Sequence, residues 1–537
     1  MVARPPDAKG STMPYRKFMP QLARPVLSAA AILMATTLAA RADLTPAGLW
    51  QDWQAQAHAA GQELSAGNTA EAAGTLTLTD VAFSAMHGSD RVSGTIPQIA
   101  LTGAGGGVDV TFSPEYPVLV ESTLPPDPEA LADGEDEAVP TRMTLLISHP
   151  GLALHATGQP EDVTYQMTMP NLTATLQEME SGETVDGSLA LQMTASGITG
   201  TYRITGAANT DHEIDTRTQV EAAGLTLSQS GPEGEEAMTD GPGGNYQMVL
   251  SAQSIETRST GARPVIAGGA TFADLIRLSA SGTLSHGPVS LTLTETDPEG
   301  QPRIVEATAE RGSADYALTH GQVAYKGETE AGRLSVSGGP EAPPMSLTAD
   351  RANFDAAFPA RVAEAAEPFR FMSRLEGVRA DDLLWQQVDP TGILPRDPAL
   401  VSLALSGTMR WLANPSDPSA MAEAPYQFET VNIDDLDISA IGAGVKGRGS
   451  FTIDNSDLTT WDGLPKPVGG LDLTIRGSDQ AMDKLVQLGL LAPQQAMVAK
   501  MMLQGFSRPG PEPGTLTTRI ELTQSGSIRA NGKGLLP

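Results

Sequence analysis

The chain has 537 residues, of which 64 are acidic and 34 are basic, so its net charge is −30, and it contains no cysteine. A charge of this sign repels phosphate backbones and argues against nucleic-acid binding. The absence of cysteine excludes disulfide frameworks, thiol catalysis and thiolate metal sites. Aromatic residues make up only 4% of the chain, which argues against base-stacking platforms and aromatic sugar-binding clefts. The length suits two to four domains or one elongated sheet.

Residues 1–42 have the pattern of a secretory signal. A basic lead-in precedes the uncharged apolar run 26–40, and Ala40-Arg41-Ala42 follows with the small-x-small spacing that signal peptidase recognises. The run is shorter than the roughly 20 residues that a permanent membrane-spanning helix needs. We therefore predict a cleaved signal peptide over 1–42, a mature chain that begins at Asp43, a periplasmic location and no permanent transmembrane anchor after cleavage.

The mature chain is expected to begin with a helix over residues 43–61. Thr45 is a good N-cap, Pro46 suits the first turn, and Gly61 suits the C-terminal end. An apolar stripe at helical spacing follows the cap: Leu49, Trp50, Trp53 and Ala57. The two tryptophans suit either a contact with a membrane surface or packing on the protein's own sheet. Because the helix carries an acid and no Lys or Arg, packing on the sheet is favoured.

Most of the remaining chain alternates between apolar and polar residues with a period of two. Five stretches show the alternation clearly: 75–79, 188–194, 289–294, 401–406 and 471–475. The pattern predicts antiparallel strands with one buried and one solvated face. We expect a mainly β fold with minor α content, with β regions over 62–350 and 393–477 and C-terminal strands over 508–537. These strands form either one long curved sheet or two consecutive β modules.

Four segments interrupt the β pattern. The acidic, Pro- and Gly-rich stretches 124–140 and 231–244 lack the apolar spacing of a core and are expected to be surface loops. Residues 351–392 are expected to be helical, with apolar residues at Phe358, Val362, Ala365, Phe369, Met372 and Leu375. Residues 478–507 are expected to form a Met-rich helical pair, divided at Pro493, that covers one face or one open end of the sheet.

A glycine-rich motif, Gly442-Ala443-Gly444-Val445-Lys446-Gly447, has the spacing of a dinucleotide-binding fingerprint. That motif binds a pyrophosphate only where a helix follows it. The strand-like stretch 449–453 follows instead, so the motif predicts a hairpin. We expect no cofactor.

The histidines and acidic clusters lack the spacing of metal sites. The histidines are scattered along the chain: His58, His87, His149, His155, His212, His286 and His320. No pair has zinc-site spacing. The acidic clusters 434–437 and 454–457 lack the glycine and terminal glutamate of a calcium loop, so solvated turns are expected. Because no catalytic constellation is recognisable, we expect the protein to bind no metal and not to be an enzyme.

Three stretches resemble a known family. They are Asp43-Leu44-Thr45-Pro46…Leu49-Trp50-Gln51-Asp52-Trp53 at the start of the mature chain, Leu473-Thr474-Ile475-Arg476-Gly477…Ala481-Met482-Asp483-Lys484-Leu485-Val486 with its Met-rich helix, and the closing Gly526-Ser527-Ile528-Arg529-Ala530-Asn531-Gly532-Lys533. Together they resemble an uncharacterised exported family of alphaproteobacteria, domain of unknown function 2125. The resemblance implies export and an extended β architecture, and it transfers no activity and no site residues.

Two classes of function remain open from the sequence. The first is an exported structural or interaction module of the cell envelope, whose partner is an envelope protein. The second is a periplasmic β protein that shields an apolar ligand or lipid, with a flexible lining of Met497, Met501, Met502 and Phe506. A hydrolase without a recognisable motif is a remote third alternative.

Overall fold

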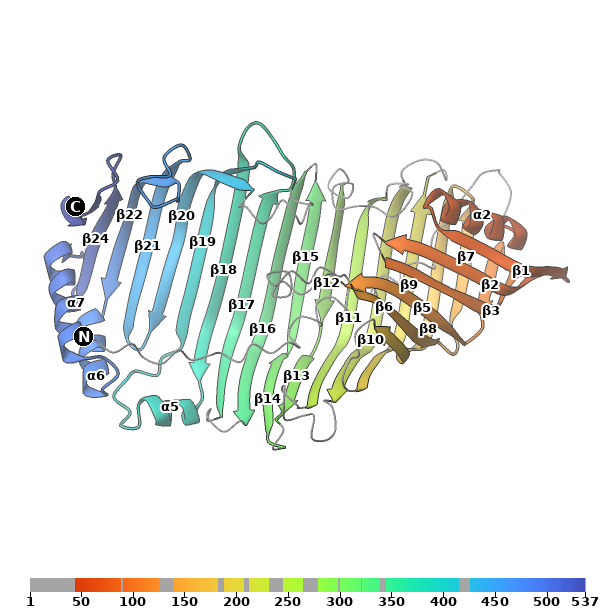
Figure 1. Cartoon of the computed structure of the whole chain (residues 1–537), viewed down its shortest axis with the longest axis horizontal. Coiled ribbons are helices and arrows are strands. Elements are labelled where there is room, and N and C mark those ends of the chain that lie inside the picture. Colours follow the sequence, from red (N-terminus) through yellow and green to blue (C-terminus); the bar gives the residue numbers. More distant parts are fainter. Residues whose placement is uncertain are drawn as a thin grey trace.

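The structure is a computed structural model, and it describes residues 44–87, 90–124, 139–181, 188–206, 212–230, 245–263, 279–297, 300–319, 321–338, 344–414 and 425–536. In this part of the chain all strands join one 26-stranded antiparallel sheet (Figure 1). The prediction of a mainly β fold with one long antiparallel sheet is confirmed. The expected signal peptide and nearly all of the two expected acidic loops lie outside the described residues.

The first nine strands form the N-terminal end of the sheet, at the right of Figure 1. They are β1 (Glu63–Ala72), β2 (Thr75–His87), β3 (Asp90–Ala104), β4 (Gly107–Phe112), β5 (Glu115–Leu124), β6 (Val139–Ser148), β7 (Ala153–Gln159), β8 (Asp162–Ser181) and β9 (Ser188–Thr205). The middle strands are β10 (His212–Ser230), β11 (Asn245–Arg263), β12 (Ala280–His286), β13 (Val289–Thr296), β14 (Pro302–Ala309), β15 (Arg311–Thr319) and β16 (Gln322–Gly338).

The C-terminal strands complete the sheet at the left of Figure 1. They are β17 (Met345–Pro359), β18 (Glu367–Ala380), β19 (Ala399–Trp411), β20 (Tyr426–Ala440), β21 (Ala443–Asp454), β22 (Lys466–Arg476), β23 (Arg508–Pro509), β24 (Thr515–Leu522), β25 (Ile528–Ala530) and β26 (Lys533–Leu536). At four positions in the sheet two short strands lie end to end in one lane: β5 with β4, β6 with β7, β12 with β13, and β15 with β14.

The N-terminal end of the sheet encloses a hydrophobic core. Strands β2 to β8 supply most of its side chains, and helix α2 (Pro46–Ala59) packs into it. Trp50 and Trp53 are each 6% exposed, and Trp53 Nε1 donates a hydrogen bond to the Tyr165 hydroxyl at 3.3 Å. The Thr45 hydroxyl caps the helix by accepting from the N–H of Gly48 at 3.1 Å. The predicted helix and its packing on the sheet are confirmed, and we call this part of the molecule the closed end.

A crease crosses the sheet from β1 to β18. At one level on successive strands the regular pairing is interrupted by a single residue: Gly67, Asp80, Pro170, Gly197, Glu221, Ser254, Ala331, Asp350 and Gly377. Five of these residues have a positive φ: Asp80, Gly197, Ser254, Ala331 and Gly377. The four lanes that are shared by two short strands break at the same level. The crease is therefore a continuous feature of the sheet.

The crease shifts the alternation of side chains by one residue. On β9, Leu191 and Met193 occupy odd positions before the crease, and Tyr202 occupies an even position after it, yet all three pack against the same core. On a regular strand odd and even positions face opposite sides. The shift at Gly197 therefore keeps the apolar residues of both halves on one face. Strands β2, β3 and β8 show the same change of phase.

Helix between residues 351 and 392 is limited to α5 (Asp382–Val388), which Asp381 caps by accepting from the N–H of Leu384 at 2.8 Å. The prediction of helix for residues 355–380 is wrong, because they form the end of β17 and all of β18. The apolar residues of β18 also alternate with a period of two, and Phe371 lies between Ala356 on β17 and Leu405 on β19. A helix here would leave the backbone groups of both neighbouring strands unpaired.

The Met-rich helical pair is confirmed at the C-terminal end of the sheet. Helix α6 (Ser478–Gln487) lies next to β21, and α7 (Pro493–Phe506) follows it (Figure 1). Asn531 fixes the C-terminal end of α7, because its Nδ2 donates to the Phe506 carbonyl at 2.8 Å. The helices thus stand at the end of the sheet opposite the closed end.

Candidate functional site

One face of the sheet is apolar from the closed end to the C-terminal helices. On one side of the crease a row of residues crosses β15, β16 and β17: Tyr316 lies opposite Tyr325, which lies opposite Ala356. On the other side of the crease a second row crosses β11, β13, β14, β16 and β17: Leu250, Leu291, Ala307, Leu334 and Leu347. Opposite residues on antiparallel strands share a face. The rows therefore form a single surface, which continues the face that encloses the core at the closed end.

Side chains on this face remain open to solvent beyond the closed end. Ten large apolar residues on it are between 36% and 51% exposed: Leu250, Leu284, Tyr316, Tyr325, Leu334, Met345, Phe354, Leu375, Val401 and Ile438. At the closed end, residues on the same face such as Leu78 and Ile99 are at most 1% exposed. The same apolar face is thus buried at one end of the molecule and uncovered along the rest. We call the surface formed by the ten residues the apolar trough.

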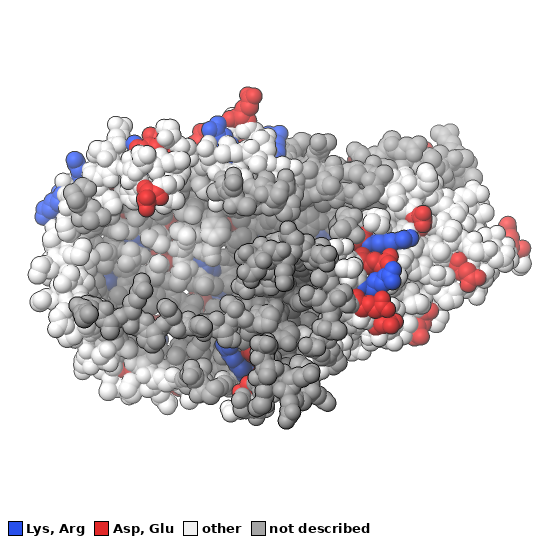
Figure 2. All heavy atoms as spheres, viewed as in Figure 1, with Lys and Arg blue, Asp and Glu red and all other residues white. Residues whose placement is uncertain are grey.

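Figure 2 shows a hollow between two rims over the part of the molecule that contains the C-terminal strands. The described atoms that are visible in the hollow are mostly uncharged, and charged side chains lie mainly on the rims and on the closed end. From β11 to β20, the strands that carry the ten trough residues, the sheet has eight strand positions. At roughly 4.8 Å per strand this gives the trough a length of about 35 Å.

The opposite face of the sheet is polar and carries ion pairs between strands. Arg203 on β9 donates two hydrogen bonds of 2.8 Å to the carboxylate of Asp162 on β8. Arg370 on β18 donates to Asp355 on β17 at 3.0 Å. The bonds from Arg203 hold the pKa of Asp162 below its ordinary value. Exposed pairs of this kind contribute at most about 1 kcal/mol each, so their main consequence is a solvated outer face.

The methionines that were expected to line a lipid site lie on helix α7 and not on the rows of the sheet. Met497, Met501 and Met502 are at least 50% exposed, on the side of the helix away from the buried Ala496. Phe506 is half-buried at the C-terminal end of the helix. The structure therefore separates these residues from the trough. None of the helices in the described ranges is long and apolar enough to cross a membrane.

Three histidine side chains in the described part of the chain have different contacts. His155 Nδ1 lies 2.5 Å from a carboxylate oxygen of Asp109, and His286 Nδ1 lies 2.7 Å from the Gly287 carbonyl. His149 is 3% exposed and contacts the Tyr116 ring at 5.3 Å between ring centroids. Among the described residues, no three histidine, aspartate or glutamate side chains lie close enough together to hold a metal ion. The side chains of His87 and His320 lie outside the described part.

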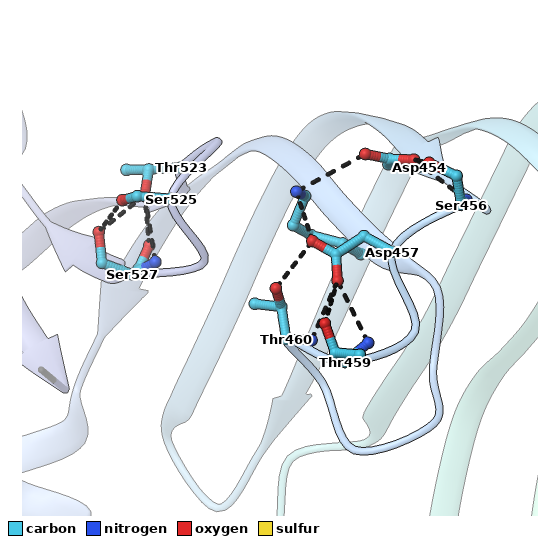
Figure 3. Close-up of polar contacts among 9 residues, drawn as sticks. Asp454, Ser456, Asp457, Thr459, Thr460, Thr523, Ser525 and Ser527 are labelled. Atoms are coloured by element: carbon cyan, nitrogen blue, oxygen red, sulfur yellow. Dashed lines mark hydrogen bonds and ion pairs between the residues drawn. The ribbon is translucent and has the colours of Figure 1, made fainter.

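The acidic cluster at 454–457 closes a loop between β21 and β22, as Figure 3 shows. Asp457 Oδ1 accepts from the N–H groups of Thr459 and Thr460 at 3.2 and 3.1 Å. Its Oδ2 accepts from the Thr460 hydroxyl at 2.8 Å and from Lys466 Nζ at 2.7 Å. These donors hold the pKa of Asp457 far below its ordinary value. Because the chain's own groups occupy the carboxylate, the arrangement is that of a hydrogen-bonded turn.

The second acidic cluster, at 434–437, lies within strand β20. Asp435 accepts from the Ser402 hydroxyl at 3.0 Å, and Asp437 pairs with Lys446 at 2.9 Å. Both contacts join neighbouring strands on the polar face. A group of hydroxyls in the β24–β25 turn is also closed by internal hydrogen bonds (Figure 3): Thr523, Ser525 and Ser527. These polar clusters stabilise turns and strand register.

The glycine-rich motif at 442–447 is a hairpin, as its sequence predicts. Ile441 and Gly442 form the turn with positive φ, and β21 follows from Ala443. Gly447 lies in the apolar face, where a Cβ would be 2.8 Å from a methyl carbon of Leu473. The glycine there permits close packing of the neighbouring leucines.

The trough residues are the functional candidates that the sequence did not single out. The alternating stretches 289–294 and 401–406 contain part of the trough face, and their alternation predicts a buried face. A period of two shows which residues share a face but not whether another layer covers it. One available signal is the shortage of helices, because a sheet of this size needs several amphipathic helices or a second sheet to cover one face.

Comparison with known proteins identifies a family for the C-terminal half of the chain. No curated protein matches the chain. Residues 264–528 match the model of a family described as "Uncharacterized protein conserved in bacteria (DUF2125)", and the match spans the strands from β12 to β24. It includes the stretch 481–486 that carries the resemblance, whereas 49–53 lies outside it. Through residues 264–528 the chain belongs to the DUF2125 family.

Proposed function

We propose that the protein is an exported, non-enzymatic carrier that shields the acyl chains of a lipid in the apolar trough. The observation that supports this most strongly is the set of ten large, partly exposed apolar side chains that form the trough on one face of the sheet. Soluble proteins rarely leave a continuous apolar patch of more than a few hundred Å² uncovered, and larger patches mark binding surfaces. Covering apolar surface stabilises a complex by about 25 cal/mol per Å², so an apolar ligand is the occupant that this surface favours.

The dimensions of the trough suit acyl chains. The hydrocarbon of one bilayer leaflet is about 15 Å thick, half of a core of about 30 Å. A trough of about 35 Å is therefore about twice as long as one extended acyl chain of a leaflet. Each CH₂ group that leaves water contributes about 0.8 kcal/mol. The closed end blocks the N-terminal end of the trough. A ligand therefore enters the trough along its open side or from its C-terminal end.

The proposed location depends on residues 1–42 acting as a cleaved signal. The location fits the function, because a lipid that crosses the aqueous periplasm needs a cover for its acyl chains. N-terminal sequencing of periplasmic protein is expected to find Asp43 as the first residue. Retention of the apolar run 26–40 in the mature protein contradicts a cleaved signal.

A matched pair of variants tests the trough. Tyr325 is 51% exposed in the trough, and Lys326 is the next residue on the same strand but faces the polar side. Tyr325→Glu places a carboxylate in the trough, whereas Lys326→Glu places one on the outer face. Native mass spectrometry and lipid extraction of protein purified without detergent are expected to find lipid in the wild type and in Lys326→Glu. Tyr325→Glu, combined with Leu284→Glu, is expected to lose it.

The competing function is a scaffold that binds an envelope protein through the same face. A photoreactive side chain at Leu284 distinguishes the two, because it captures either a lipid or a protein from cells. Cross-links to lipid support the carrier. Cross-links to one protein, together with a lipid-free wild type, replace the carrier with the scaffold. Wild-type protein without lipid that also fails to bind a fluorescent acyl probe overturns the proposal.

A further inference from the structure

The C-terminal end of the molecule presents an apolar surface that is separate from the trough. Met497, Val498, Met501 and Met502 occupy adjacent positions on α7 and are 50% to 65% exposed. Leu490, in the turn between α6 and α7, is 51% exposed. We call these five residues the end patch. Four large apolar side chains on one side of a 14-residue helix, facing away from the buried Ala496, form the pattern of a helix that binds an apolar surface.

Cations lie at one end of the end patch. Arg508 follows the end of α7, and Lys533 lies at the same end, because its Nζ donates to the Gly505 carbonyl at 2.8 Å. Helix α7 itself contains no acid, and its one cation, Lys500, pairs with Asp483 on α6 at 2.6 Å. Figure 2 shows basic side chains at this end of the molecule. The end patch is therefore an apolar surface with a basic border.

The local charge contrasts with the charge of the whole chain. Residues 478–536 contain six cations and four acids: Lys484, Lys500, Arg508, Arg519, Arg529 and Lys533 against Asp479, Asp483, Glu512 and Glu521. The whole chain has a net charge of −30. An anionic surface therefore attracts the C-terminal end and repels the rest of the molecule. The charge distribution favours an end-on approach to such a surface.

We propose that the end patch docks on an anionic lipid bilayer, so that the sheet stands end-on and the closed end points away from the membrane. Helices that lie in a membrane interface combine an apolar face with basic residues, and anionic lipid headgroups attract those residues. The end patch has both features on one helix and its border. The proposal goes beyond lipid shielding in the trough, because it concerns a different surface and stands without it.

The absence of cysteine from the chain allows one fluorophore to be placed at a chosen position. Met501→Cys places an environment-sensitive dye in the end patch, and Met86→Cys places it at the closed end, where Met86 is 44% exposed. With vesicles of phosphatidylglycerol and phosphatidylcholine, the dye at position 501 is expected to shift to the blue, and the dye at position 86 is expected not to change. An unchanged dye at 501, or equal shifts at both positions, overturns the proposal.

Vesicle flotation measures the binding itself. Met497→Asp combined with Met501→Asp is expected to weaken binding to phosphatidylglycerol vesicles by about tenfold or more, because two exposed methionines that the bilayer would cover are lost. Met86→Asp is the control, and circular dichroism confirms that each variant folds. Lipid retained in the trough of the double variant shows that the two surfaces act separately. A shift of the dye at 501 that depends on protein concentration without vesicles identifies a second copy as the occupant and overturns bilayer docking.

Discussion

Gly197 and Glu221 face each other across strands β9 and β10, and the side chain of Glu221 fills the space beside the glycine. A Cβ on Gly197 would lie 2.4 Å from Cγ of Glu221, and Gly197 has a φ of +60°. Gly377 and Asp350 repeat the arrangement on β18 and β17, with φ at +67°. At these two positions the crease therefore uses a glycine, which adopts the left-handed region without strain, and a neighbouring acidic side chain covers it.

Gly197→Ala is expected to destabilise the protein by about 1–2 kcal/mol, because an alanine in the left-handed region is strained and its Cβ displaces Glu221. Gly332→Ala is the matched control, since nothing lies within 4 Å of its Cβ and its φ is ordinary. Urea unfolding monitored by circular dichroism measures both. An equal loss of stability in the two variants contradicts this account of the crease.

His149 is expected to make stability depend on pH. It is 3% exposed among aromatic rings, and burial holds its pKa below the ordinary value of about 6.5. The unfolded chain then binds a proton more readily than the folded one, so stability falls as the pH drops from 6.5 towards the folded pKa. The loss is at most about 1.4 kcal/mol per pH unit. Urea unfolding at pH 7.5 and 5.5 is expected to show a smaller difference for His149→Met than for the wild type. An unchanged pH dependence in His149→Met contradicts the role of His149.

Trp53→Ala is expected to destabilise the closed end by about 3–5 kcal/mol, because it removes a buried ring and leaves a cavity beside Tyr165. Trp385 on α5 is the control, since its ring is half-buried and contacts the Arg396 guanidinium at 5.3 Å. Trp385→Ala is expected to lower the free energy of unfolding by less than Trp53→Ala does. Hydrogen exchange resolved by segment is expected to place the loss of Trp53→Ala in strands β1 to β8. A loss of protection that is confined to α2 shows that strands β1 to β8 fold without the packed helix, and contradicts this prediction.

Asp457→Asn is expected to loosen the loop between β21 and β22, because the amide replaces a carboxylate that accepts from Thr459, Thr460 and Lys466. Hydrogen exchange in residues 454–466 should become faster, whereas Asp462→Asn in the same loop should leave it unchanged. Calcium should not protect the wild-type loop, because chain donors already occupy the carboxylate. Protection of the loop by added calcium would show that the turn is a cation site.

The sequence contains strong local signals for most of the fold. The alternation of Leu189, Leu191 and Met193 predicts a strand, and Thr45 with Pro46 predicts the start of α2. For residues 355–380 the apolar positions fit a helix as well as a strand. Pairing with β16 and β19 decides in favour of the strand, and that pairing is not visible in a local window.

The crease and the trough are less visible in the sequence, for two different reasons. The crease leaves a local signal, because the apolar residues of β9 change from odd positions at Met193 to even positions at Ile198. The phase change is readable once a strand of 18 residues is recognised as continuous. The trough leaves no local signal, since exposure of Tyr325 or Phe354 depends on the absence of a covering layer in the described structure.

The connections between strands have a consequence for how this architecture can change in size. From β16 to β22 each strand pairs with the next one in the chain. Insertion or deletion of one hairpin therefore lengthens or shortens the sheet by about 10 Å and leaves every other connection intact. The closed end and the C-terminal helices remain as fixed terminal pieces around a middle of adjustable span. The number of hairpins therefore sets the distance between the closed end and the C-terminal helices.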